Sequence, residues 1–154
     1  MKIVLCLLLI GVFTFAGYLL ANKFTDRKNF YNDFDVFNKK MIGEINFAKN
    51  SLPKIINSLN SNSIFNDTLK KYIQNTNSYI FTYKFLSNDE LDYFYDYLRN
   101  LGESDSITQL KFLRSVEEYL GEKNKIVNDE YKKYRPLYIK LGFLFGLIAF
   151  VILI

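Results

Sequence analysis

Two apolar runs at the ends of the chain constrain its fold more than any other feature. The first extends from Ile3 to Ala21 and has 19 uncharged residues, and the second covers 137–154. A helix rises about 1.5 Å per residue, so each run is just long enough to cross the roughly 30 Å hydrocarbon layer of a membrane. Lys140 lies close enough to the start of the second run for its side chain to reach the interface. We therefore predict transmembrane helices at 1–22 and 137–154 on either side of one folded domain at 23–136.

Basic residues beside these runs predict the side of the membrane on which the central domain lies. Eight of them stand there against the single acidic residue Asp26: Lys2, Lys23, Arg27, Lys28, Lys132, Lys133, Arg135 and Lys140. The positive-inside rule then places the domain in the cytoplasm and both termini outside. Between Asn29 and Glu130, 12 basic residues face 15 acidic ones. Because this part is mildly acidic, the net charge of +4 does not indicate a nucleic-acid partner.

A cleavable signal peptide is the alternative interpretation of the first run. Lys2 would be its charged start, and Thr14-Phe15-Ala16 resembles a cleavage site of the small-x-small type. The run exceeds the usual ~7–15 apolar residues, and the three basic residues that follow resist translocation. These features favour a retained span. With cleavage, the chain would instead be an exported or generic membrane-tethered helical interaction protein, held by its C-terminal anchor.

Apolar residues of the central region recur at intervals of three and four, which predicts an all-α, antiparallel helical bundle. One stripe continues the first run without a break: Phe24, Phe30, Phe34, Phe37, Met41, Ile45 and Ala48. Asn50-Ser51-Leu52-Pro53 then ends this helix, with Asn50 or Ser51 as the cap of a short helix that carries Ile55 and Ile56. Further helical stripes are predicted at 64–73 and at 79–86. The β-branched and aromatic residues of 79–86 could in isolation form a strand, but the lack of any strand partner favours a helix.

Two helix-start patterns flank a predicted turn at Gly102. Ser87 and Glu90 match a capping box, and Gly102 follows that helix as a residue with left-handed backbone. Ser104 to Ser106, with Gln109, then start the last helix, in which apolar residues recur every seven positions: Leu113, Leu120, Val127 and Tyr134. This helix would run about thirty residues to the membrane. The terminal helices are thus expected to be long and continuous with the membrane spans.

The residue types argue against an enzyme. There is no His, and the one Cys, Cys6, lies in the first apolar run, so neither a His/Cys zinc site nor a Cys/His catalytic pair can form within one chain. Adjacent carboxylates such as Glu117-Glu118 point about 100° apart on a helix, and no phosphate-binding loop is present. We expect no catalytic residue, no metal, no cofactor and no small-molecule substrate.

Two features are candidates for protein contacts, and each has a second interpretation. Residues 88–105 hold six acidic residues against Arg99 alone. They form either a solvated helix face or a docking surface for a basic partner. The residues that we propose as candidates for the docking surface are Asp92, Asp96 and Glu103. Gly142 and Gly146 form a GxxxG pair, which lets another helix approach closely but is also frequent by chance in lipid-facing helices.

Four segments together carry a resemblance to a known family. The first is the apolar N-terminal run that leads to basic residues. The second resembles a Glu-Ile pair followed by a Thr-Pro-Leu-Pro turn, and comprises Glu44-Ile45, Phe47 and Leu52-Pro53. The third is similar to Leu-Gly-x-Ser-Asp-x-x-x-Gln-x-Lys and comprises Leu101, Gly102, Ser104, Asp105, Gln109 and Lys111. The fourth is similar to Tyr-x-x-Leu-Gly-x-Leu-x-Gly-Leu and comprises Tyr138, Leu141, Gly142, Leu144, Gly146 and Leu147.

In this order and spacing, the segments resemble the stage III sporulation protein AB family of endospore-forming bacteria over nearly the whole chain. There are three departures. Asn50-Ser51 stands where the family has Thr-Pro, the region 58–63 is shortened, and Pro136 is expected to interrupt the last helix just before the membrane.

The resemblance implies a non-enzymatic part of the mother-cell complex that spans the membranes around the engulfed forespore. It implies a location in the mother-cell membrane around the forespore. It also implies a cytoplasmic bundle similar to the platform proteins of type II secretion and type IV pilus machines. The implied partners are a secretion-type ATPase and other membrane subunits of the same complex.

Overall fold

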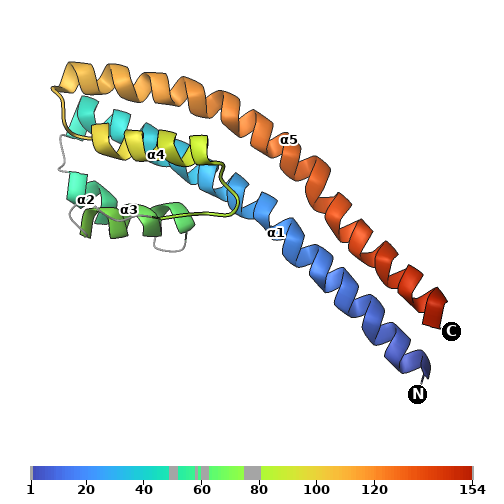
Figure 1. Ribbon diagram of the computed structural model, residues 1–154. Helices are drawn as coiled ribbons and strands as arrows, with labels where there is room; N and C mark the ends of the chain where they lie inside the picture. The colour runs from blue at the N-terminus through green and yellow to red at the C-terminus, as the bar shows by residue number, and fades with distance from the viewer. Residues whose placement is uncertain (1, 49–51, 58, 60–62, 75–80, 154) are drawn as a thin grey trace. The chain divides into compact units, whose positions relative to one another are not determined.

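The computed structural model describes residues 2–48, 52–57, 59, 63–74 and 81–153, and within these ranges it contains helices and no strand. The helices follow the order α1 (Lys2–Gly43), a π-helical segment (Glu44–Ala48), α2 (Leu52–Asn57), α3 (Ile64–Gln74), α4 (Asn88–Asn100) and α5 (Ser106–Leu153) (Figure 1). The prediction of an all-α chain with long terminal helices is confirmed. The proposed caps Asn50 and Ser51 lie outside the described residues.

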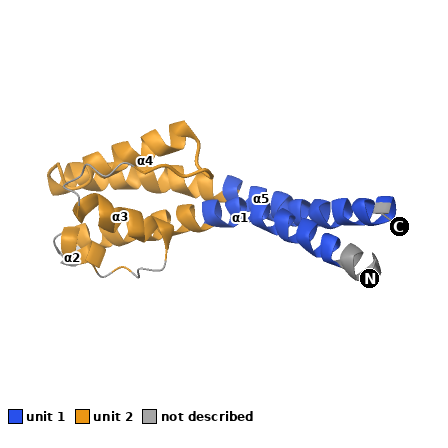
Figure 2. Ribbon diagram, turned by 60° about the horizontal axis from the view of Figure 1, so that its bottom comes forward, with its two compact units in different colours: residues 1–28, 126–154 blue, residues 29–125 orange. Residues whose placement is uncertain are grey.

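The chain forms two compact units (Figure 2). Unit 1 comprises residues 1–28 and 126–154, and unit 2 comprises residues 29–125. Both α1 and α5 contribute to each unit. Unit 1 therefore contains both apolar ends of the chain together with all eight of the basic residues beside them.

In unit 1, α1 and α5 run antiparallel and side by side (Figure 1). Both helices are long and apolar enough to cross a membrane, and the apolar window of each is only 11% buried. A core helix of a soluble protein would be mostly buried. Large apolar side chains instead face outward, among them Leu8, Phe15, Leu144, Ile148 and Val151. Two candidate membrane helices are therefore present.

Unit 2 is built around a cluster of aromatic rings. Phe30, Phe34 and Phe37 project from one face of α1, as their spacing predicts, and all three are buried. The ring of Phe34 lies 5.2 Å from that of Phe65 on α3 and 4.6 Å from that of Tyr97 on α4. From α5 the core receives Leu113, Val116 and Leu120. Offset and edge-to-face ring contacts of this kind add to the stabilisation that burial itself provides.

The helix predicted at 79–86 is wrong in its described part. Residues 81–87 are not helical and make a turn at 84–85, whereas Tyr79 and Ile80 lie outside the described residues. The hydroxyl of Tyr95 accepts a hydrogen bond from the Phe81 amide (2.7 Å) and donates one to the Phe81 carbonyl (2.9 Å). The two rings also stack at 4.4 Å. A side chain of α4 thus satisfies backbone groups that a helix would otherwise have paired.

The interruption expected at Pro136 is also wrong, because α5 continues through this residue to Leu153. Proline removes one backbone donor and leaves one carbonyl, that of residue 132, without its helical partner. The ring of Phe24 on α1 lies 5.5 Å from the rings of both Tyr134 and Tyr138. Contacts on either side of Pro136 therefore hold α5 against α1 across the site of the lost hydrogen bond.

Candidate interaction surfaces

The turn between α4 and α5 brings together five of the six residues of the third family segment, Lys111 being the exception. Leu101 is buried and caps α4, and Gly102 follows with φ +83°, the left-handed conformation that the sequence predicts. Gln109 is buried, and its Oε1 accepts hydrogen bonds from the Gly102 amide (3.1 Å) and the Ser104 hydroxyl (3.1 Å). The first turn of α5 thus closes back onto the end of α4.

Asp105 completes this arrangement as the cap of α5. Its Oδ2 accepts hydrogen bonds from the amides of Ile107 (3.1 Å) and Thr108 (3.2 Å). Hydrogen bonds from Thr108, chiefly from its side chain, lower the pKa of the Asp105 carboxyl below its usual 3.8. The cap therefore contributes stability above pH 3.8, and loses it as the pH falls through the lower, folded-state pKa.

We expect Gly102→Val to destabilise unit 2 by ~1 kcal/mol or more, because a β-branched side chain is unsuited to positive φ. Thermal unfolding of the full chain in mild detergent, followed by circular dichroism, measures the change. Gly121 is the control, since it lies inside α5 with open space around it. Gly121→Ala should raise stability by ~0.5–1 kcal/mol. Equal melting temperatures for Gly102→Val and the unmodified chain would contradict the role of this turn.

The three candidate docking carboxylates are all exposed. Asp92 and Asp96 lie four residues apart on one face of α4, and Glu103 lies in the turn that follows. The opposite face of α4 is buried through Leu91, Phe94, Tyr97 and Leu98. Asp96 lies 3.7 Å from Arg99, and both side chains of this pair are about 70% exposed, so the pair adds little stability. These carboxylates are accessible to a partner.

Glu90, a fourth acidic residue of this stretch, does not belong to the exposed surface. Its side chain is only 6% exposed and lies 2.9 Å from the ammonium of Lys123 on α5, while its Oε2 accepts from the Ser87 amide (3.0 Å) in the predicted capping box. Burial raises the pKa of the neighbouring Tyr31 hydroxyl on α1 far above its usual value, and the Glu90 carboxylate adds to this shift. Glu90 thus forms an ion pair with α5 and helps to raise the pKa of Tyr31 on α1.

Lys123 was not singled out from the sequence, although a signal was present. It lies three residues after Leu120 and four before Val127, in the apolar stripe of α5. A lysine at such a position must reach solvent or find an acidic partner.

The glycine pair of the fourth segment lies at the contact between the two helices of unit 1. A Cβ atom at Gly142 would meet the Phe13 carbonyl at 2.6 Å and the Gly17 Cα at 3.0 Å. At Gly146 it would meet the Cα of Ile10 at 2.9 Å. Real Cβ atoms essentially never approach backbone this closely. These glycines therefore face α1 of the same chain, and Gly17 is a third member of the contact that the sequence analysis did not identify.

The family model of stage III sporulation protein AB matches residues 2–154. The chain belongs to this family. No curated protein and no solved structure matches it. The resemblance carried by the four sequence segments is therefore confirmed over the matched residues.

Membership of the stage III sporulation protein AB family relates the chain to sporulation. Within this family member, the third segment forms the turn closed by Gln109, and the fourth forms the close helix contact at Gly142 and Gly146. Both segments thus have a structural role.

Proposed function

We propose that this chain is a non-enzymatic, membrane-anchored platform component of the sporulation complex between mother cell and forespore. Unit 1 anchors it in the mother-cell membrane that surrounds the forespore. Unit 2 lies in the mother-cell cytoplasm, where it docks a secretion-type ATPase and other membrane subunits of the same complex. The sporulation family and the two candidate membrane helices support this proposal.

The observation that carries the docking role is the exposure of Asp92, Asp96 and Glu103 on and beside α4. Phe94 and Tyr97 fix the opposite face of this helix in the aromatic core, so that the carboxylates are held on a rigid element. Such a surface favours a partner with a complementary basic face.

Charge reversal at these three positions tests the docking role. The triple variant Asp92→Lys, Asp96→Lys and Glu103→Lys should keep its helical circular dichroism, because exposed substitutions away from caps change stability by only about 0.5 kcal/mol each. It should lose capture of the complex's secretion-type ATPase by the full chain, since like charges at an interface cost several kcal/mol. Capture by the unmodified chain should weaken as salt rises.

A matched control reverses three exposed acidic residues elsewhere in unit 2, on α3 and α5: Asp67, Glu118 and Glu122. This variant has the same net charge as the first and should still capture the ATPase. Undiminished capture by the α4 variant, or equal loss in both variants, would show that the acidic face of α4 is not the docking surface.

A further inference from the structure

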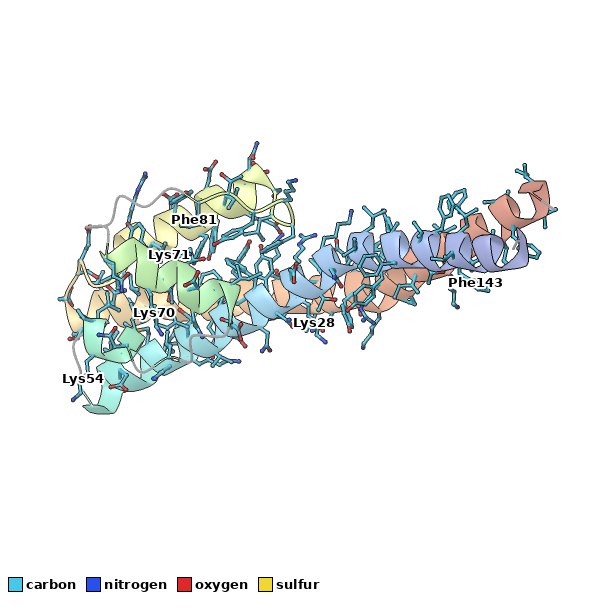
Figure 3. The ribbon with its side chains drawn as sticks, turned by 90° about the horizontal axis from the view of Figure 1, so that it is seen from below. Lys28, Lys54, Lys70, Lys71, Phe81 and Phe143 are labelled. Atoms are coloured by element: carbon cyan, nitrogen blue, oxygen red, sulfur yellow. The ribbon has the colours of Figure 1, made fainter. Side chains whose placement is uncertain are left out.

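Basic residues are concentrated in the part of unit 1 next to its apolar segments. We call this group the basic collar, and its members on α1 and α5 are Lys23, Arg27, Lys28, Lys132, Lys133, Arg135 and Lys140. Three acidic residues are interspersed: Asp26, Asp129 and Glu130. Figure 3 shows Lys28 on α1 and, farther along unit 1, the outward-facing Phe143 on α5. The collar thus adjoins an exposed apolar surface.

Few of the collar cations are neutralised within the chain. Arg27 forms an ion pair with Glu130 at 2.7 Å. Among the described residues, no carboxylate lies within ion-pair distance of the other six collar side chains. Their charge is therefore balanced by salt or by an external anion.

Aromatic rings hold several of these cations in place. The ammonium of Lys23 lies 5.0 Å from the centre of the Phe24 ring and 5.2 Å from that of Tyr138. Lys133 lies 5.2 Å from the ring centre of Tyr134. Tyrosines of this kind favour the membrane interface, and cation–π attraction keeps the charges at the level of the rings.

The ring of Tyr131 lies close to two cationic side chains that come from different helices. The ammonium of Lys28 on α1 lies 4.3 Å from its ring centre, and the guanidinium of Arg135 on α5 lies 5.5 Å from the same centre. Two like charges gathered at one ring repel each other, and an anion beside them would remove that cost. The Nε atom of Arg135 is buried and has no hydrogen-bond partner in the described structure.

We infer that the basic collar binds the headgroups of anionic phospholipids, with Lys28 and Arg135 beside Tyr131 as its centre. A guanidinium can hold two phosphate oxygens at once, and the ammonium adds a point charge. Leu137 and Leu141, next to the collar on α5, are 44% and 40% exposed and offer apolar surface to an acyl chain. A phospholipid supplies an anionic headgroup and an apolar chain in one molecule, which matches cations that lie beside exposed leucines. This inference rests on the proposed insertion of unit 1 in a membrane.

Spin-labelled lipids test the inference on the full chain in phosphatidylcholine bilayers. Recovery of the chain with the bilayer fraction tests insertion separately, before any lipid preference is measured. Electron paramagnetic resonance then compares labelled phosphatidylglycerol with labelled phosphatidylcholine at the protein surface. We expect a preference of about threefold or more for phosphatidylglycerol, which should fall as salt rises.

The double variant Lys28→Gln and Arg135→Gln should lower this preference by about half or more, and the four other collar cations without an ion-pair partner should account for what remains. Its control, Lys111→Gln and Arg114→Gln, removes the same charge from exposed positions of α5 in unit 2 and should keep the preference. Equal association of both lipids with the inserted, unmodified chain would overturn the inference. An undiminished preference in the collar variant, or an equal loss in the control, would overturn it as well.

Discussion

Gly142→Ile should separate the two apolar segments of unit 1. The new side chain would begin with a Cβ atom 2.6 Å from the Phe13 carbonyl and 3.0 Å from the Gly17 Cα, both of them backbone atoms that cannot rotate away. Overpacking of this kind costs ~1–3 kcal/mol or more when helices must shift. That corresponds to a roughly fivefold or greater fall in the equilibrium constant for pairing of the two helices.

Cross-linking between α1 and α5 measures this effect in the membrane-embedded full chain. Cysteines at Phe24 and Tyr138, whose rings lie 5.5 Å apart, can be joined by a short bifunctional thiol reagent in a Cys6→Ser background. Gly11→Ile is the control, because nothing lies within 4 Å of a Cβ atom at Gly11. It should leave the cross-linking yield unchanged. A yield for Gly142→Ile that equals the control would refute close packing at this glycine.

Lys123→Met should have the largest effect on unit 2. The substitution keeps the length and apolar stem of the side chain but leaves the buried Glu90 carboxylate without its cation. Breaking one side of a buried ion pair typically costs 3–5 kcal/mol, and we expect ~3 kcal/mol here because Lys123 is 24% exposed. Thermal unfolding of the full chain in detergent, followed by circular dichroism, measures the loss.

Two further variants distinguish the loss of the Lys123–Glu90 ion pair from the effect of lowering the net charge of the chain. Lys125→Met removes a charge from an exposed position on the same helix and should change stability by no more than about 0.5 kcal/mol. Adding Glu90→Gln to Lys123→Met removes the buried charge while keeping an acceptor for the Ser87 amide, and should restore most of the stability. Additive losses in the double variant would show that the two side chains act independently.

Much of the fold could be predicted because its signals are local. The spacing of Phe30, Phe34 and Phe37 identifies the buried face of α1, and the pair Ser87 and Glu90 marks the start of α4. Gly102 marks the turn through its backbone freedom alone. Each of these signals depends on residues close together in the chain, so no knowledge of tertiary contacts is needed.

The remaining features depend on contacts between distant residues. Residues 81–87 are not helical because Tyr95 of α4 satisfies the backbone of Phe81, and α5 continues through Pro136 because Phe24 of α1 packs on both sides of it. The sequence shows that Gly142 and Gly146 are suited to close helix packing, but not which helix they contact. The structure shows that this helix is α1, which contributes Gly17 to the contact. The exposure of the docking candidates Asp92 and Asp96 follows from the helical period of α4. The identity of a binding partner, in contrast, produces no periodic pattern in the sequence.

Cysteine labelling in intact cells tests most directly whether the membrane helices hold unit 2 in the cytoplasm. In a Cys6→Ser background, one variant carries Gln74→Cys at an exposed position of α3, and another carries a cysteine in a hydrophilic tag after Ile154. Both are expressed in vegetative cells of an endospore-forming bacterium and treated with a membrane-impermeant maleimide. We predict that the tag reacts in intact cells and that Gln74→Cys reacts only after the cells are opened. Labelling of Gln74→Cys in intact cells would contradict a cytoplasmic platform and would indicate an exported domain instead.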